Sequence, residues 1–425
     1  MQFDMLHPKD QIIMIMERIY GYGMTTTSGG NLSILDDNGD IWITPAGVDK
    51  GSLTRDDIIC VKPDGKLVGN HKASSEFPFH ELIYRTRPDV RAVVHAHPPA
   101  LVAFSIVRKI PNLHVLPNDY LICGEVGMAE YGLPGSVQLG ENIARVFAQG
   151  IDTVMLENHG VVIGKSDLFE AFKAFETLDY CARLEIKANR IGKLVTLSPE
   201  KLEKKREIKL NEFIPSGYSA EEREIRREMC KLIKRAYDQR LFTSTQGTFS
   251  QRVGEKSFVI TPYGLDRKYL EPDDLVRVDE GLREIGKIPS RSVRLHELIY
   301  QTQPHVHSII IAHPPNIMAF AVTSSIFDSR IIPESYILLR GMPKLPFGAT
   351  YLSMELTAEV FNKDTPIVLF ENDCVIATGH SLLNAFDRLE VAEYSAKAII
   401  STQCLGDVVP IDTAKIKEID IAFHL

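Results

Sequence analysis

The amino-acid sequence predicts two homologous α/β domains in tandem, each of about two hundred residues, a usual size for one hydrophobic core. The first observation is an internal repeat. His80-Glu-Leu-Ile-Tyr84 recurs as His296 to Tyr300, and Ala96-His97-Pro-Pro99 recurs as Ala312 to Pro315. The second observation is that short apolar runs typical of strands and amphipathic stretches typical of helices occur in both halves. The two halves of this chain can therefore be compared position by position.

Three amphipathic stretches are predicted to be helices. Lys9 to Tyr20 has apolar residues at helical spacing, and Glu221 to Arg240 repeats it in the second half. Leu168 to about Arg190 carries an apolar stripe and closes the first domain. The predicted organisation is a first domain at 1–200, a charged linker at 201–217 that contains the run Lys201 to Lys209, and a second domain with a C-terminal tail at 218–425.

The composition agrees with a globular protein. Of the 425 residues 44% are hydrophobic and 24% charged, and the formal net charge of −8 argues against a nucleic-acid partner. No apolar stretch approaches the roughly 20 residues of a membrane span, and the first residues lack a basic start followed by an apolar core. The six cysteines are scattered without a Cys-x-x-Cys pair, as expected for reduced thiols. We expect a cytoplasmic protein with no membrane partner.

Three histidines form a candidate metal site. His95 and His97 close an apolar run, Val90 to Val94, and residues two apart on a strand face the same way. His159 follows a second strand-like run, Thr153 to Leu156, at a turn. Three imidazoles that leave room for a substrate oxygen are the ligand set of an open catalytic site, most often for zinc. The alternative is three unrelated histidines that bond to the backbone.

The second half keeps the scaffold and loses most of these polar residues. His97 retains a histidine, His313, as its counterpart. The other positions change as follows: His95 to Ile311, His159 to Asp373, Glu76 to Ser292, and Asn31 to Thr248. A purely structural cluster would be expected to persist as well as the apolar pattern does. The first half is therefore predicted to be catalytic and the second half to be a non-catalytic copy.

Five ordered motifs in the first half resemble the class II aldolase/adducin family. They are Ser28-Gly29-Gly30-Asn31-Leu32-Ser33, Thr44-Pro45-Ala46-Gly47, Ser74-Ser75-Glu76, His95-Ala96-His97 and Asn158-His159-Gly160. The resemblance covers nearly all of each half. It implies a three-layer α/β/α domain with a mainly antiparallel central sheet.

The resemblance also implies the roles of individual residues. A divalent metal, zinc or a related ion, would be held by His95, His97 and His159, and Glu76 would be the catalytic acid/base. The phosphate of a sugar phosphate would be held by Asn31, Gly47, Ser74 and Ser75. Glycine turns with small hydroxyl side chains can form such an anion cradle. The implied activity is that of a metal-dependent aldolase, which cleaves a ketose phosphate of the fuculose or rhamnulose type through a metal-stabilised enediolate.

Several alternatives remain open at the level of sequence. Ala46 stands where many aldolases of the family have a hydroxyl residue, which leaves a non-phosphorylated or acidic substrate possible. The same metal site serves epimerases, dehydratases and decarboxylases of sugar phosphates, and adducin-like members are non-catalytic scaffolds. Tyr131 is the local candidate for a second acid/base, and a residue of the second domain is equally possible. The family resemblance further implies a homo-oligomer with active sites at domain or subunit interfaces.

Overall fold

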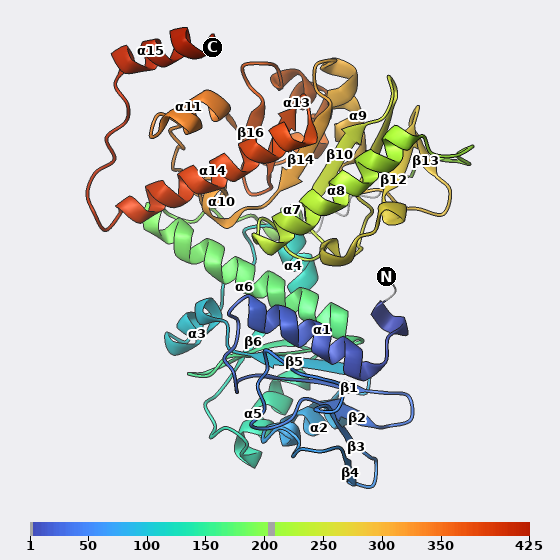
Figure 1. Cartoon of the computed structure of the whole chain (residues 1–425). Helices are drawn as coiled ribbons and strands as arrows, with labels where there is room; N and C mark the ends of the chain where they lie inside the picture. Colours follow the sequence, from blue (N-terminus) through green and yellow to red (C-terminus); the bar gives the residue numbers. More distant parts are fainter. Residues whose placement is uncertain (1–2, 203–208) are drawn as a thin grey trace. The chain divides into compact units, whose positions relative to one another are not determined.

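The central sheet of the N-terminal half orders its eight strands β4-β3-β2-β1-β5-β8-β7-β6 (Figure 1). Every neighbouring pair is antiparallel except β6 and β7, which run parallel. The strands are β1 (Asn31–Leu35), β2 (Ile41–Ile43), β3 (Ile59–Val61), β4 (Leu67–Val68), β5 (Ala92–Ala96), β6 (Val126–Ala129), β7 (Thr153–Leu156) and β8 (Val161–Lys165).

This computed structural model describes residues 3–202 and 209–425. Its chain divides into two compact units. We call residues up to Leu113 together with Asn118–Arg183 the first unit, and His114–Pro117 together with Leu184–Leu425 the second unit. Residues 203–208 of the predicted charged linker lie outside the described residues.

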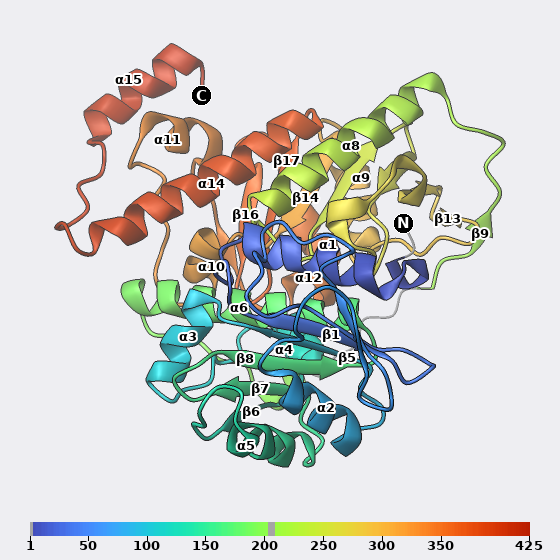
Figure 2. The ribbon, with the colours of Figure 1, turned by 60° about the horizontal axis from the view of Figure 1, so that its bottom comes forward.

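Helices cover both faces of the first sheet. They are α1 (Pro8–Gly21), α2 (Phe77–Thr86), α3 (Pro99–Ile106), α4 (Pro117–Cys123), α5 (Val137–Phe147) and α6 (Leu168–Ile191), with a short 3-10 helix, η1 (Phe3–Met5), before them. Helices α1 and α6 lie on one side of the sheet and α2 and α5 on the other (Figure 2). Helices α1 and α6 contact each other where the Arg18 guanidinium lies 4.4 Å from the centroid of the Phe172 ring.

The second unit repeats this plan with a nine-stranded sheet in the order β15-β16-β17-β14-β10-β11-β12-β13-β9. Two edge pairs, β15 with β16 and β13 with β9, are parallel, and the other pairs are antiparallel. The strands are β9 (Glu212–Phe213), β10 (Thr248–Arg252), β11 (Ser257–Ile260), β12 (Val276–Asp279), β13 (Leu282–Glu284), β14 (Ser308–Ala312), β15 (Lys344–Leu345), β16 (Ile367–Phe370) and β17 (Val375–Gly379).

The helices of the second unit again form two layers. They are α7 (Pro199–Leu202), α8 (Ala220–Asp238), α9 (Val293–Thr302), α10 (Pro315–Ala321), α11 (Pro333–Leu339), α12 (Ala349–Leu352), α13 (Met354–Val360), α14 (Leu382–Thr402) and α15 (Thr413–Phe423), with 3-10 helices η2 (Arg267–Tyr269) and η3 (Pro272–Asp274). Helices α8 and α14 pack on one face of the sheet, and α9 and α13 lie together on the other.

The predicted α/β fold with mainly antiparallel sheets is confirmed. The strand pair β1 and β5 of the first unit has the same register as the corresponding pair β10 and β14 of the second unit. Asn31 faces His95 in the first pair, and Thr248 faces Ile311 in the second. The predicted helix Leu168 to Arg190 is α6, and the predicted strand Thr153 to Leu156 is β7. Strand β9 lies within the predicted linker and pairs with β13, so this part of the linker belongs to the second sheet.

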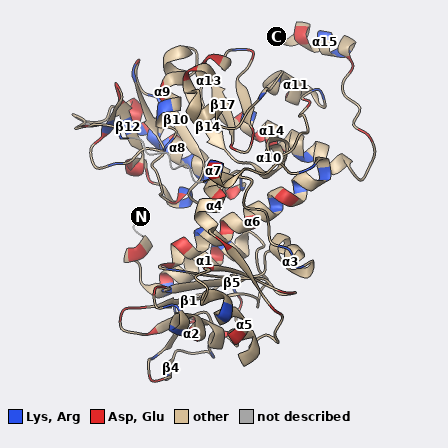
Figure 3. Ribbon diagram, turned by 180° about the vertical axis from the view of Figure 1, so that it is seen from behind, with Lys and Arg blue, Asp and Glu red and all other residues tan. Residues whose placement is uncertain are grey.

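The surface carries both signs of charge. Acidic and basic residues are interspersed along the helices of both units (Figure 3). None of the helices in the described part of the chain combines the length and apolarity needed to cross a lipid bilayer.

Candidate metal centre

Strand β5 brings the first two histidines of the candidate metal site together. Strand β5 pairs with β1 on one side and β8 on the other, and its residues other than His95 are β-branched or small; all five are buried. His95 and the next residue but one, His97, point to the same face. Their Nε2 atoms lie 3.1 Å apart. That spacing is close to the roughly 3.3 Å expected between two nitrogens on one tetrahedral zinc ion.

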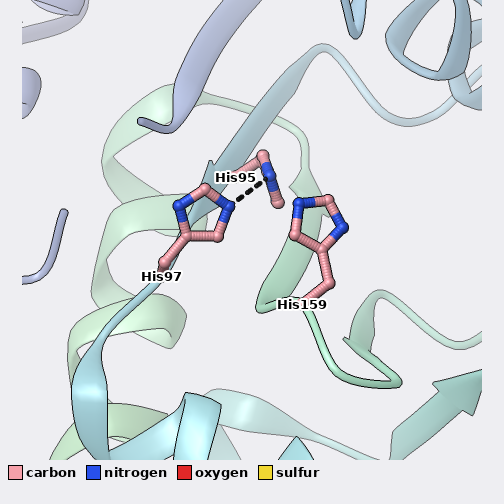
Figure 4. A group of neighbouring side chains, drawn as sticks. All are labelled: His95, His97 and His159. Atoms are coloured by element: carbon pink, nitrogen blue, oxygen red, sulfur yellow. Dashed lines mark hydrogen bonds between the residues drawn. The ribbon is translucent and has the colours of Figure 1, made fainter. Parts of the chain in front are cut away.

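His159 reaches the same point from the turn between β7 and β8. Asn158, which precedes it, adopts a left-handed conformation with φ of 54°, and the turn ends at Gly160. A Cβ atom at Gly160 would lie 2.5 Å from the carbonyl oxygen of Ala96. Glycine therefore permits the turn to approach β5 closely, and the three imidazoles point toward one another (Figure 4).

The three histidines fit a divalent metal ion in geometry and in protonation. One ligand nitrogen from each of His95, His97 and His159 lies within 4.8 Å of the others, and they are the one such group found in the described residues. Burial lowers the pKa of His97 to about 3 and that of His159 to about 4, so both imidazoles are neutral at physiological pH. Neutral imidazoles offer the lone pairs that metals require.

A backbone contact fixes the tautomer of His95. Its Nδ1 lies 2.9 Å from the carbonyl oxygen of Val161 on the neighbouring strand β8. A carbonyl only accepts, so Nδ1 carries a proton, and Nε2 faces the other histidines. This arrangement of a histidine whose second nitrogen is held by a carbonyl is usual around bound metals.

Glu76 lies beside the histidine cluster at the start of α2. Its Oε2 is 3.2 Å from Nε2 of His95, and its Oε1 is 3.5 Å from Nε2 of His159. The side chain is buried, which by itself raises the pKa of the carboxyl, but the neighbouring His95 and a hydrogen bond from Asn31 outweigh burial and lower it. Glu76 is therefore a carboxylate that lies beside the imidazoles of His95 and His159.

Some polar atoms of the cluster have no hydrogen-bond partner. Within the described parts of the chain, Oε1 of Glu76 accepts no hydrogen bond and Nδ1 of His159 makes none, although both atoms are buried. Buried polar groups are nearly always satisfied, and Oε1 of Glu76 faces Nε2 of His159, so this oxygen indicates a missing partner at the histidine cluster. We conclude that the donor set fits a bound cation.

The residues expected to bind phosphate lie around the start of α2. Ser74 and Ser75 directly precede Glu76, and the amide of Glu76 donates to the hydroxyl of Ser74 at 3.3 Å. Gly47 is exposed, has a φ of 68°, and has open space where a Cβ would stand. Asn31 donates its amide hydrogen to Glu76 at 2.8 Å. Backbone hydrogen bonds from Ser74 to Thr44 and from Ala46 to Lys72 hold the Gly47 turn beside the loop that leads to the two serines, and the phosphate assignment remains a prediction.

The structure adds groups that the sequence analysis did not single out. Lys50 is 2% exposed and donates from Nζ to the carbonyls of Pro45 and Val48, which holds the Gly47 turn in place. Its burial lowers the pKa of the ammonium. The sequence contained one signal for Lys50, since a basic residue, Arg267, occupies the corresponding position of the second half. In the structure Arg267 is also buried beneath a glycine turn.

Tyr131, the predicted local acid/base, is 55% exposed, and its backbone amide donates to Glu157. The structure gives its phenol no specific role.

The corresponding positions in the second unit cannot hold a metal in the same way. His313 stands where His97 does, and burial lowers its pKa to about 4. Ile311 replaces the central ligand His95, and the carboxylate of Asp373 accepts a hydrogen bond from Thr350. Ser292 begins α9 with nearly the backbone conformation with which Glu76 begins α2. The backbone is thus repeated while the ligand set is lost.

Comparison with known proteins gives the family. The family model "Class II Aldolase and Adducin N-terminal domain" matches residues 10–186 and 227–400. Because these regions make up more than half of the chain, the protein belongs to the class II aldolase and adducin family.

Each of the individual relatives described next aligns with less than half of the chain, which is about the length of one of the two matched regions. The chain is 33% identical over 181 residues to an L-fuculose phosphate aldolase of Methanococcus maripaludis, which covers 43% of this chain and 97% of that protein. It is 31% identical over 183 residues to a 3-oxo-tetronate 4-phosphate decarboxylase of Haemophilus influenzae, covering 42% of this chain and 87% of that protein. A solved L-fuculose 1-phosphate aldolase has 32% identity and a TM-score of 0.42, and covers 46% of this chain and 92% of its own.

Proposed function

We propose that the first unit is a metal-dependent aldolase that cleaves a ketose phosphate of the fuculose or rhamnulose type. The observation that carries the proposal is the convergence of three imidazoles with one buried carboxylate, Glu76. Relatives of this chain include L-fuculose phosphate aldolases, which supports the reaction class.

In this proposal His95, His97 and His159 hold zinc or another divalent ion. When bound, the ion supplies Lewis-acid stabilisation of the negative charge that develops on the substrate oxygen as the carbon–carbon bond breaks. Zinc, cobalt, manganese and iron share such ligands, so the histidines alone do not select the metal.

Glu76 moves the proton at carbon. As the bond to the departing aldehyde breaks, its electron pair remains on the ketone-derived fragment, and Glu76, which has first taken up a proton from solvent, delivers that proton to the carbon to give dihydroxyacetone phosphate. In the direction of synthesis the Glu76 carboxylate removes the same proton. The departing hydroxyl gives up its proton to a second base, for which Tyr131 and a residue of the second domain are the candidates. Positioned acid/base groups of this kind contribute about 10²–10⁴-fold to a rate.

The phosphate group would be bound by Asn31, Gly47, Ser74 and Ser75. The start of α2 favours an anion because the first amide groups of a helix point outward and carry partial positive charge. Lys50, buried behind the Gly47 turn, adds a positive charge to this side of the domain. The two seryl residues stand next to Glu76, which would place the phosphate within one substrate length of the metal.

A second candidate reaction on the same site is decarboxylation of a 3-oxo acid phosphate. It is favoured by the similarity to a 3-oxo-tetronate 4-phosphate decarboxylase. Ala46, which takes the place of a hydroxyl donor at the predicted phosphate site, leaves a non-phosphorylated or acidic substrate possible. Epimerase, dehydratase and non-catalytic scaffold functions are further outcomes of the test. We also propose that the protein is a homo-oligomer with active sites at domain or subunit interfaces.

The proposal is tested by metal analysis followed by a substrate panel. We expect one divalent ion per chain in the wild type, none in His159→Ala, and one in His313→Ala, which removes the counterpart of His97 in the second unit. Fuculose, rhamnulose, ribulose and tetronate phosphates are then assayed for aldehyde release, inversion, loss of water and carbon dioxide. A chain that takes up no metal after reconstitution would exclude the enzyme and leave the scaffold function.

A further inference from the structure

Five buried side chains of the first unit form one continuous chain of hydrogen bonds that ends at Glu76. The hydroxyls of Tyr84 and Ser33 lie 2.6 Å apart, and Ser33 lies 2.7 Å from Nδ1 of His80. Nε2 of His80 is 2.5 Å from Oδ1 of Asn31, whose Nδ2 donates to Oε2 of Glu76 at 2.8 Å. All five side chains are less than one-tenth exposed. This chain therefore links the Tyr84 end of α2 to the metal centre.

Secondary structure explains why these five residues meet. Glu76, His80 and Tyr84 are spaced four residues apart along the start and body of α2, so they line one face of the helix. Asn31 and Ser33 are two apart on β1 and face the same side of the sheet. These hydrogen bonds lie along the interface where α2 packs on β1. They include both ends of the His80-Glu-Leu-Ile-Tyr84 motif.

The chemistry of the two ends sets the direction of every hydrogen bond. A carboxylate only accepts, so the amide nitrogen of Asn31 must face Glu76 and its oxygen must face His80. Nε2 of His80 therefore carries the proton and donates to Asn31. Burial lowers the pKa of His80 to about 3, so the ring is neutral and its Nδ1 accepts from Ser33. Ser33 in turn accepts from Tyr84.

The second unit contains the same series of hydrogen bonds, but there the series ends before it reaches the position that corresponds to the metal centre. The hydroxyl of Ser250 lies 2.7 Å from Nδ1 of His296 and 2.7 Å from the hydroxyl of Tyr300. Nε2 of His296 is buried and has no hydrogen-bond partner among the described residues. Thr248, which replaces Asn31, bonds instead to Ser290 at 2.7 Å. The Tyr–Ser–His part thus belongs to the scaffold of both units, and the Asn–Glu extension occurs in the first unit alone.

We propose that His80 is a positioning residue for the proton transfer at Glu76. By donating from Nε2 it fixes the orientation of the Asn31 amide, and that amide in turn holds one oxygen of the Glu76 carboxylate. The other oxygen, Oε1, is thereby left free of hydrogen bonds and directed to the side of His159. The inference rests on the proposed role of Glu76 and names a residue that touches neither metal nor substrate.

Three variants separate positioning from simple packing. Asparagine at position 80 places a polar atom where Nδ1 stands and none where Nε2 stands, whereas glutamine reaches the Nε2 position and can still donate to Asn31. We expect His80→Asn to lower kcat by about 10–100-fold with little change in KM, as is typical when a supporting partner is lost, and His80→Gln to recover most of it. His296→Asn is the matched control, because it removes the same ring from the same scaffold, and kcat should not change.

The tautomer of His80 gives a readout that does not depend on activity. In ¹⁵N-histidine NMR spectra of the metal-free full chain, we expect His80 to be neutral with the proton on Nε2, and the His80 signals to shift in Asn31→Ala. A proton on Nδ1 would overturn the inference while leaving the proposed function intact. Equal kcat losses in His80→Asn and His296→Asn, or no recovery in His80→Gln, would also overturn it. If the wild type turned over no sugar phosphate, the proposed function would fail, and the tautomer would still decide whether the chain runs to Glu76.

Discussion

The two units have nearly the same backbone around the metal position but different chemistry. In the first unit β1 and β5 present Asn31 opposite His95, and in the second unit β10 and β14 present Thr248 opposite Ile311 in the same register. Asn158 and Asn372 both adopt a left-handed conformation, with φ of 54° and 50°, at corresponding turns. A fold can thus be kept by its apolar residues and turns while the polar residues of its site are replaced.

The hydrogen bonds behind the site show where the two units begin to differ. The pairs Ser33–His80 and Ser250–His296 have the same length, 2.7 Å. The two units differ at the next member of the hydrogen-bond series, which is Asn31 in the first unit and Thr248 in the second. A buried hydrogen bond between helix and sheet is costly to leave unmade wherever the fold recurs, whereas a ligand is needed only where a metal binds. This explains why the His80–Tyr84 motif recurs in the second half and Glu76 does not.

The largest effect that the comparison predicts is at Glu76. Glu76→Gln keeps the size of the side chain and an oxygen that accepts from Asn31, but it cannot exchange a proton. We expect kcat to fall by about 10²–10⁴-fold, the usual contribution of a general acid or base, with one metal ion still bound per chain. Ser292→Ala, the matched change at the start of α9, should leave kcat at the wild-type value. Activity that survived Glu76→Gln unchanged would remove this carboxylate from the reaction.

A metal site rebuilt in the second unit would sharpen the comparison further. In the His159→Ala background, we expect Ile311→His together with Asp373→His to restore one divalent ion per chain. The reason is that Ala312 pairs with Val375 as Ala96 pairs with Val161, so a carbonyl is available to orient the imidazole introduced at 311. Replacing the buried Ile311 should cost about 2–4 kcal/mol of stability, so circular dichroism must accompany the metal analysis. A folded triple variant that bound no metal would mean that the two backbones are not equivalent.

The smallest predicted effect concerns the two glycine turns. Gly47 and Gly264 have φ of 68° and 74°, and neither has a heavy atom within 4 Å of its Cβ position. Gly47→Ala and Gly264→Ala should therefore each cost only about 1–2 kcal/mol, from the left-handed conformation. We expect KM to rise in Gly47→Ala alone, because only that methyl group would crowd the proposed phosphate. Urea unfolding and steady-state kinetics measure the two quantities, and an equal KM in both variants would argue against a phosphate at Gly47.

Much of the fold was predictable because its signals are local. Alternating and 3.6-residue apolar patterns depend on neighbours along the chain, and they located α1, α6, α8 and β7 to within a few residues. The repeat then related the two halves. The pairing of β9 with β13 was not predictable, since Glu212–Phe213 is a two-residue strand within a charged segment and pairs only because a sheet edge lies beside it.

The sequence by itself determined the family, the two-fold repetition and which half carries three histidines and a glutamate. Residue identity and order are sufficient for these conclusions. Only the tertiary structure decided that His159 lies beside His95 across two strands, that Glu76 lies 3.2 Å from His95, and that His80 connects to Glu76 through Asn31. Those contacts join residues that are distant in the chain, and their geometry is fixed by how α2 packs on β1 and how closely the Gly160 turn approaches β5.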